Sequence, residues 1–365
     1  MQRHHNVPSN KSPLKLCLAQ HPLLPRRPKE SGIALLLTLL VLTILIVIIG
    51  QLSFTSTQNT IVAENFNNDL QNWYGVSSGY QHGILYLQDD IDRASNTVDS
   101  FNEEWAKPHT ISVGNAAVAI TIEDEHSKIN LSLLYNSDGG AYKTTAEKLK
   151  RLITNSGYEE KYADMITDYI DKDANGNYEL NAKNSQIINL EELLRIDELL
   201  PDILYGGIAD GVSRKGIMPF ITTQRISQIT LPDGKTLQLP PLTTININTA
   251  PAEVFMSLSP DITQEIANNI ITYRQTVEQN GQLKEFHNID ELKNVQGITD
   301  EILNAIKPSL TVKSNFFCIK VKSAIGNLEK VRAYTVYRDT NAKVVHLVTS
   351  QTVKTFLSIK PETTK

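Results

Sequence analysis

An uninterrupted apolar run near the N-terminus is the strongest pattern in the chain. Residues 33–49 contain no charged side chain, and only Thr38 and Thr43 among them are even mildly polar. A run of this length can cross the hydrocarbon core of a bilayer, about 30 Å thick, as one helix whose backbone hydrogen bonds are all internal. We therefore predict a membrane-spanning helix over residues 33–54.

The charges on either side of this run predict its orientation. Basic side chains dominate the residues before it, and the residues after it begin with the acids Glu64 and Asp69. Because positively charged flanks stay in the cytoplasm, we expect a cytoplasmic N-terminus and a long C-terminal part on the other side of the membrane. The basic residues are Arg3, Lys11, Lys15, Arg26, Arg27 and Lys29, opposed by Glu30.

The helix is expected to continue beyond the membrane. From residue 51 to about residue 92 the chain has few Gly or Pro residues and keeps apolar side chains at helical spacing. Gly75, Gly79 and Gly83 recur every fourth residue and so lie along one face. We expect this face to pack closely on a small sheet; tight contact with another helix is the alternative.

Alternation of apolar and polar residues predicts β structure in two parts of the chain that are far apart. We expect these segments to form one antiparallel sheet packed on the long helix, with Cys318 in its core rather than reactive. The segments are residues 110–122, 315–325, 330–339 and 344–352.

A helical region separates the two sets of β segments, so the predicted fold class is α+β. The helical insertion covers residues 141–312 and has two lobes, 141–218 and 242–312, separated by a proline-punctuated linker or hairpin. Residues 188–196 and 288–295 echo each other, because each is a short amphipathic helix after an Asn. The insertion would split the helix-and-sheet domain into residues 55–140 and 313–355, followed by a tail over residues 356–365.

Two acidic segments could bind metal. Glu123, Asp124 and Glu125 lie beside His126, but no second ligand cluster stands at a fixed spacing from them, so we expect a solvated turn there. Residues 171–179 instead resemble the first half of a calcium loop, with acidic or amide oxygens at alternate positions before a glycine.

The calcium loop is incomplete. Ala182 stands where an EF-hand has its bidentate Glu, so a complete EF-hand is excluded. A calcium site completed by other segments and a polar Asn-Gly turn both stay open. The candidate ligands are Asp168, Asp171, Asp173, Asn175 and Glu179.

The junction Lys29-Glu30-Ser31-Gly32-Ile33 resembles the processing site of type IV pilin-like proteins. The resemblance implies that prepilin peptidase removes residues 1–32 as a basic leader, cleaves between Gly32 and Ile33, and methylates the amine of Ile33. A cleaved secretory signal is disfavoured because residues 50–54 supply no A-x-A-like site. A plain signal anchor is the remaining alternative.

Loss of such a leader would change the formal net charge from −5 to −10, because it removes six basic residues and one acid. An acidic chain is a poor general ligand for nucleic acid. Cys17 would leave with the leader, so the mature chain could form no internal disulfide. The sequence contains no nucleophile elbow, Walker loop, Cys-x-x-Cys pair or His-x-x-x-His spacing, so an enzyme is the least expected class.

The second lobe resembles a helix-hairpin-helix DNA-binding module of the DNA-uptake type. That fold grips phosphate with backbone N–H groups at its hairpin turns. Here Asp261 occupies the first turn, and Asp300 and Glu301 follow Gly297 in the second. Residues 244–312 contain nine acidic and four basic residues, a net charge of −5 that repels a polyanion. We therefore expect the fold without the DNA function.

Most pilin-like subunits carry Glu at the fifth mature position, where it meets the N-terminal amine of a neighbouring subunit; here that residue is Leu37. A subunit without this Glu resembles a tip subunit, the K minor pseudopilin of type II secretion. Two further segments are similar to that family, the acidic pair before Lys128-Ile129-Asn130 and the Asn-x-Asn-Thr-Ala segment that begins at Asn246. The resemblance implies calcium binding in the globular region.

The resemblance also implies a function. We expect a minor pseudopilin at the tip of the type II secretion pseudopilus that initiates its assembly and supports export of folded proteins. Expected partners are the I, J and H minor pseudopilins, the major pseudopilin, prepilin peptidase and the inner-membrane secretion platform. The expected location is the inner membrane, with a periplasmic C-terminal domain. The alternatives are a membrane-anchored DNA receptor for competence and a minor pilin of a type IV pilus.

Overall fold

The structure is a computed structural model that describes residues 31–92, 97–135, 140–209, 211–279 and 281–352. It divides into two compact units, residues 1–65 and 66–365. The expected leader falls almost wholly on residues 1–30, and the expected tail on residues 353–365, which lie outside the described residues.

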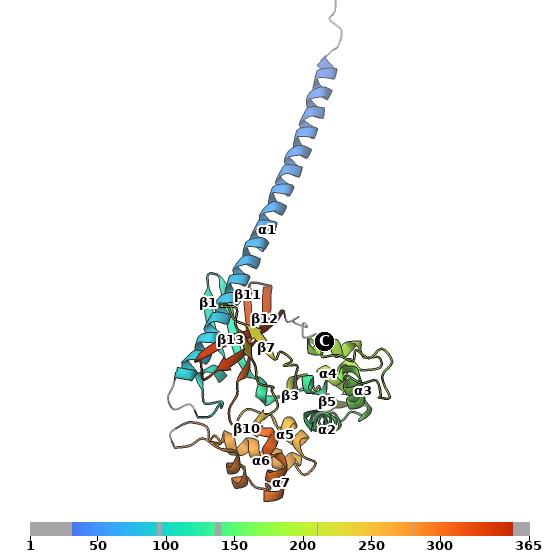
Figure 1. Cartoon of the computed structure of the whole chain (residues 1–365). Coiled ribbons are helices and arrows are strands. Elements are labelled where there is room, and N and C mark those ends of the chain that lie inside the picture. Colours follow the sequence, from blue (N-terminus) through green and yellow to red (C-terminus); the bar gives the residue numbers. More distant parts are fainter. Residues whose placement is uncertain (1–30, 93–96, 136–139, 210, 280, 353–365) are drawn as a thin grey trace, which may run out of the picture. The chain divides into compact units, whose positions relative to one another are not determined.

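The first unit contains, among its described residues, the N-terminal part of helix α1 (Ser31–Asp92) (Figure 1). The apolar side chains of residues 33–49 are all exposed. In the part of the chain that the structure describes, α1 is the one helix long and apolar enough to cross a membrane.

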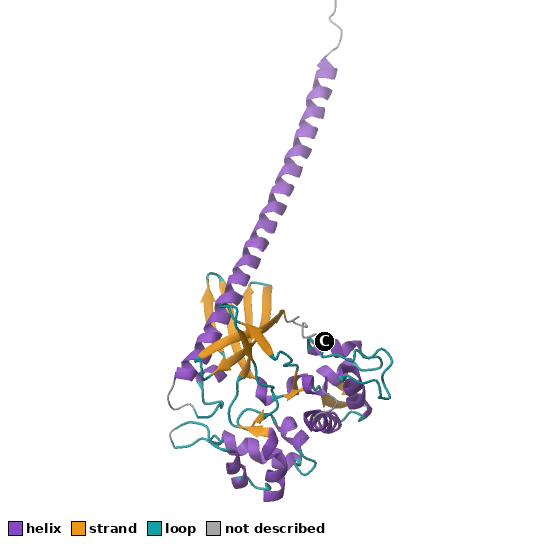
Figure 2. Ribbon diagram, in the orientation of Figure 1, coloured by secondary structure: helices purple, strands orange, loops and turns teal. Residues whose placement is uncertain are grey.

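The second unit is built on a five-stranded antiparallel sheet of order β1-β2-β11-β12-β13 (Figure 2). Its middle pair joins β2 to β11, strands from opposite ends of the helical insertion, with Ile319 opposite Ile122. The strands are β1 (His109–Val113), β2 (Ala116–Asp124), β11 (Phe316–Ile325), β12 (Leu328–Asp339) and β13 (Val344–Thr352).

One strand expectation is wrong in detail. Residues 110–122 do not form a single strand but a hairpin of β1 and β2, in which Val113 pairs with Ala116. The turn places Gly114 at φ +59°, a left-handed conformation that glycine adopts at no steric cost. The three C-terminal strands form where the alternation predicts them.

The C-terminal half of α1 packs on this sheet through its glycine face. A Cβ atom added to Gly79 would lie 2.5 Å from Val321 Cγ1 and 2.9 Å from Val118 Cγ1, and one added to Gly83 would lie 2.6 Å from Ile319 Cγ2. The glycines therefore allow close approach of helix and sheet, as expected. The core between them includes Val76, Leu87, Trp105, Ile120 and Phe317, all buried.

The first lobe of the insertion begins and ends in a two-residue parallel pair, β3 (Ile129–Asn130) with β6 (Ile221–Thr222). Its helices are η3 (Leu131–Tyr135), α2 (Gly140–Asn155), α3 (Lys161–Ile170), η4 (Leu190–Arg195), α4 (Pro201–Tyr205) and η5 (Met218–Phe220), where η marks a 3₁₀-helix. A hairpin of β4 (Gly206–Ala209) and β5 (Val212–Lys215) follows α4.

The second lobe repeats this plan. It is closed by the parallel pair of β9 (Ile245–Asn246) with β10 (Leu310–Thr311). Between these strands lie α5 (Ala252–Leu258), α6 (Gln264–Gln275), η6 (Ile289–Asn294), α7 (Asp300–Ile306) and η7 (Lys307–Ser309). The hairpin of β7 (Gln228–Thr230) and β8 (Thr236–Gln238) joins the lobes. Two 3₁₀-helices, η1 (Glu104–Ala106) and η2 (Glu125–Ser127), flank the β1–β2 hairpin.

The two lobes share local geometry as well as element order. Asn130 and Asn246 stand at equivalent positions of the two closing pairs, and each side-chain oxygen accepts a hydrogen bond from the backbone N–H two residues later, at 3.1 and 2.9 Å. The echoing segments form η4 and η6, each with an Asn at its N-cap. One continuous hydrophobic core serves both lobes.

Replacement of Gly79 by alanine tests the helix–sheet contact. Alanine favours the helix by about 1 kcal/mol, but its methyl group would meet two stiff valines, and overpacking of this kind costs about 1–3 kcal/mol. We expect Gly79→Ala to lower the free energy of unfolding of the full chain in detergent, measured with denaturant. Ser77→Ala, an exposed change on the same helix, is the control, and an equal effect of the two changes would contradict the packing.

Candidate functional site

The carboxylate of Asp124 joins the sheet to the second lobe. Asp124 is the last residue of β2 and is 4% exposed. Its Oδ2 accepts hydrogen bonds from Asn246 Nδ2 at 3.0 Å, Thr249 Oγ1 at 2.6 Å and Ser314 Oγ at 2.7 Å. We call Asp124 and these three donors the joint. The Asn-x-Asn-Thr-Ala segment therefore acts by holding lobe 2 on the sheet.

The expectation of a solvated turn at residues 123–126 is wrong. Asp124, Glu125 and His126 are all buried. The Glu125 carboxylate accepts hydrogen bonds from Lys128 Nζ at 3.0 Å and from the Thr222 hydroxyl. Because Thr222 lies at the end of lobe 1, the second bond attaches that lobe to the same turn. Lys128 is a local partner, but Thr222 and the three donors of the joint are about a hundred or more residues away in sequence, so local spacing could not reveal them.

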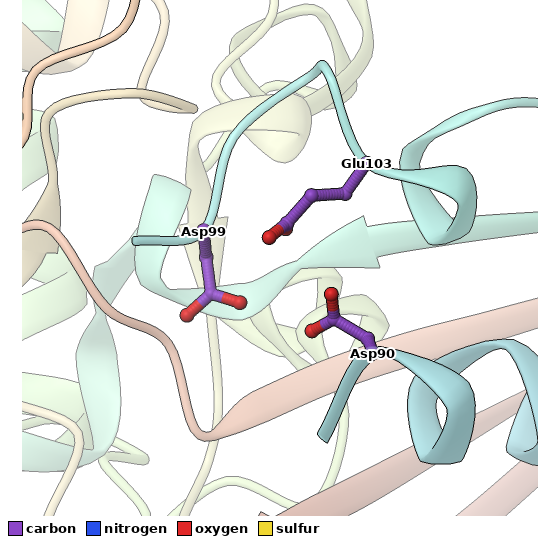
Figure 3. A group of neighbouring side chains, drawn as sticks. All are labelled: Asp90, Asp99 and Glu103. Carbon is purple, nitrogen blue, oxygen red and sulfur yellow. The ribbon is translucent and has the colours of Figure 1, made fainter. Parts of the chain in front are cut away.

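A second acidic cluster lies beside the joint, made of Asp90 at the end of α1, Asp99, and Glu103 before η1 (Figure 3). Figure 3 shows the three carboxylates pointing toward one another, and each offers an oxygen within 4.8 Å of the others. Arg338 of β12 donates to both Asp90 and Asp99, and its Nη2 also donates to the Ser314 carbonyl at 2.7 Å. The guanidinium is thus the cation that this cluster contains.

One guanidinium does not neutralise three carboxylates, two of them buried and that of Glu103 half-buried. Burial, reinforced by the negative charges of Asp99 and Asp90, raises the pKa of Glu103 to about 9. Burial also raises the pKa of Asp99 to about 6, although Arg338 opposes the rise. Glu103 therefore holds a proton at neutral pH, while its Oε2 accepts hydrogen bonds from the Trp105 indole and the Ser100 backbone N–H.

The loop after α3 gathers three of the candidate calcium ligands. Asp171, Asp173 and Glu179 each offer an oxygen within 4.8 Å of the others. Asp171 is 3% exposed, and its Oδ1 is buried without a hydrogen-bond partner among the described residues. Burial and the charge of Asp173 raise the pKa of Asp171 to about 6. A buried carboxylate oxygen without a donor, beside two further carboxylates, fits a hard cation.

The other two candidates have different positions. Asp168 lies outside this group; its Oδ2 accepts the backbone N–H of Tyr178 at 2.9 Å and so holds the loop closed. A Cβ on Gly176 would overlap the Asp168 carboxylate, which explains the glycine. Asn175 donates its backbone N–H to Asp173 Oδ1 at 3.0 Å and is itself exposed.

The second lobe has the two hairpins of a helix-hairpin-helix module. Thr263 and Thr299 are the N-caps of α6 and α7, and each side chain accepts the N–H of the third residue after it. Gly297 adopts φ +94°, and a Cβ there would lie 2.7 Å from Ile266. The hairpin geometry is therefore present, while Asp261, Asp300 and Glu301 remain at the turns where DNA phosphates would bind.

Comparison with known proteins gives a fold match over most of the chain. The family described as helix-hairpin-helix motif matches residues 242–311, and no curated protein matches the sequence. Among solved structures, the chain is similar to one in the crystal structure of the GspK-GspI-GspJ complex from the enterotoxigenic Escherichia coli type 2 secretion system. The TM-score is 0.56 at 15% identity, and the match covers 81% of this chain and 99% of that chain.

The fold is that of GspK. The GspK match confirms the α+β class, the antiparallel sheet and the helical domain expected from the sequence. The helix-hairpin-helix match lies within lobe 2 of that fold and covers the two capped hairpins. Lobe 2 is thus one part of the GspK-like insertion.

The residues of the expected processing site lie in the first turns of α1. Gly32 and Ile33 are exposed, and an added Cβ at Gly32 would meet no atom within 4 Å. Leu37 is 56% exposed. No other part of this unit surrounds them among the described residues, so the cleavage site and the role of Leu37 stay predictions.

The proton on Glu103 predicts a pH dependence of stability. Its pKa is about 9 in the fold and about 4.5 in the unfolded chain, so its contribution is fully present at low pH and is lost as the pH rises toward 9. Glu103→Gln keeps an oxygen that can accept from Trp105 and Ser100 but cannot ionise. We expect unfolding experiments on this variant to show a smaller loss of stability between neutral pH and pH 9 than in the wild type.

The exposed neighbour Glu104, which pairs with Lys107 at the surface, supplies the control. Glu104→Gln should keep the wild-type pH dependence. If Glu103→Gln also keeps it, the folded protein does not hold this proton.

Proposed function

We propose that this protein is a minor pseudopilin at the tip of a type II secretion pseudopilus, where it initiates assembly and supports export of folded proteins. The observation that carries the proposal is the GspK fold, which extends over 99% of that chain. The GspK of that structure is in a complex with GspI and GspJ. We expect this chain to assemble with the corresponding I and J minor pseudopilins, and with the H minor and major pseudopilins.

The N-terminal helix supports the anchoring part of this proposal. The apolar residues of α1 would hold the precursor in the inner membrane with a cytoplasmic N-terminus and a periplasmic C-terminal domain. Prepilin peptidase would then cleave between Gly32 and Ile33 and methylate Ile33, and the inner-membrane secretion platform would take up the mature helix. The apolar Leu37 suits a subunit that has no further subunit above it.

The acidic charge of lobe 2 supports secretion over DNA uptake. Lobe 2 has the hairpins but carries a net charge of −5 over residues 244–312. Of its four basic side chains, Arg274 is buried and donates to the Ile247 carbonyl at 2.9 Å, and Lys307 pairs with Asp290. We therefore assign the lobe a structural role, and we propose no catalytic activity for the protein.

Crosslinking in native membranes tests the assembly. We expect the full chain to crosslink to the I and J pseudopilins of its own secretion system and to give no gel shift with DNA at low salt. Crosslinking that recovers neither subunit would contradict the tip assignment. A DNA shift at low salt would instead favour a DNA receptor.

We further propose that Asp171, Asp173 and Glu179 hold a calcium ion that fixes the loop after α3. The unpartnered Oδ1 of Asp171 supports this assignment, and Tyr142 Oη, 3.3 Å from Asp171 Oδ2, would connect the ion to α2. The three carboxylates would supply oxygen ligands to the ion, and its positive charge would offset their mutual repulsion.

Calcium at about 100 times its dissociation constant should stabilise the wild type by about 2.7 kcal/mol, which thermal unfolding would detect as a rise in Tm of several degrees. Asp171→Asn should abolish this rise. In chelator the same variant should be at least as stable as the wild type, because it removes one repelling charge. Asp164→Asn, an exposed change on α3, should leave the calcium response intact, and a response that survives Asp171→Asn would contradict the site.

A further inference from the structure

A buried histidine lies between the sheet and the second lobe. His126 is in η2, directly after β2, and is 7% exposed. Its ring is stacked near Phe316, the first residue of β11, with 6.2 Å between the ring centroids. On the lobe side, Nδ1 lies 3.0 Å from the carbonyl oxygen of Thr244, one residue before β9. The imidazole thus contacts the point where lobe 2 leaves the sheet.

The hydrogen bond to Thr244 fixes the tautomer of the neutral ring. A carbonyl oxygen can only accept, so Nδ1 must carry the hydrogen, and Nε2 is left as an unprotonated acceptor. Nε2 is buried and has no hydrogen-bond partner among the described residues. A proton added to Nε2 would therefore create a buried N–H with no acceptor, and unpaired buried donors are costly.

The charged groups around the ring are already engaged. From β2 and η2, the carboxylates of Asp124 and Glu125 favour the imidazolium, and from β12 the guanidinium of Arg338 opposes it. Asp124 Oδ1 accepts the His126 backbone N–H at 2.8 Å, while its Oδ2 accepts the three donors of the joint. Neither Asp124 oxygen can turn toward Nε2 without breaking the joint.

We propose that His126 forms a proton-sensitive contact between lobe 2 and the sheet. The neutral ring holds lobe 2 on the sheet, and the attachment loosens when the ring becomes charged in mildly acidic surroundings. Burial lowers the pKa of His126 below its ordinary value of 6.5. The unfolded or opened state therefore binds the proton more tightly than the closed state. The stabilisation by neutral His126 is fully present above about pH 6.5, the ordinary pKa of histidine. It is lost as the pH falls through the lower pKa that His126 has in the folded protein.

Hydrogen exchange on the full chain in detergent tests this proton-sensitive contact. Deuterium exchange at the C2 position of His126, followed by mass spectrometry, reports its pKa, which we expect to lie below the ordinary value of 6.5. His82, which is exposed, is the control position. Backbone amides near the contact report opening. One is the Asp99 N–H, which donates across this contact to the Val312 carbonyl at the end of lobe 2, at 2.9 Å.

Between about pH 7.5 and pH 5, and after correction for intrinsic exchange, we expect protection of the Asp99 amide to fall, because the opened state binds the proton on His126 more tightly than the closed state. His126→Asn places an amide N–H near the former Nδ1, retains a donor for Thr244, and cannot become charged. It should lose this pH response, while His82→Asn should keep it.

An ordinary or raised pKa of His126 in the wild type would overturn the proposal even if the Asn variant did not fold. An equal pH response in wild type and His126→Asn would also overturn it, because the response would then come from the other acids near the joint. Neither measurement depends on secretion. A result that contradicts the proton-sensitive contact would therefore leave the proposed function intact, and a result that contradicts the proposed function would leave this contact intact.

Discussion

The burial of one carboxylate is the constraint on which the rest of the second unit depends. Asp124 accepts hydrogen bonds from its own turn, from the first residues of lobe 2, and from Ser314 in the connection between lobe 2 and β11. A buried carboxylate is tolerated only when hydrogen-bond donors surround it, and a hydrogen bond to a charged group typically contributes about 1.5–3 kcal/mol. The split sheet and the insertion are therefore stable in one relative arrangement, which Arg338 reinforces through Asp99.

The two lobes of the insertion share one plan and differ in the elements added to it. Both lobes begin with the same Asn turn and close with a parallel pair. Lobe 1 has the acidic loop after α3 and a hairpin after α4, whereas lobe 2 has the two capped hairpins and a net negative charge. The helix-hairpin-helix match thus reports the geometry of lobe 2, and nucleic-acid binding does not follow from that geometry.

Local pattern predicted the elements that depend on local chemistry. The apolar run, the glycine face of α1 and the three C-terminal strands needed only periodicity. The acidic group of Asp171, Asp173 and Glu179 could be predicted because its members are close in sequence. Asp124 and the Arg338 cluster were not visible, because their partners come from segments separated by many residues, and an acidic triplet beside a turn is usually solvated. Gly114 could have predicted the turn between β1 and β2, but apolar and polar residues alternate on both sides of it, which is also typical of one continuous strand.

We propose that cleavage after Gly32 leaves a pilin-type helix that starts at Ile33 and anchors the GspK-like domain in the membrane. The mass of the N-terminal peptide of protein extracted from native membranes tests this proposal. We expect a mature chain that starts at Ile33 and carries one methyl group on its amine. Membrane-bound protein that retains its basic leader, or that begins at another residue, would contradict it.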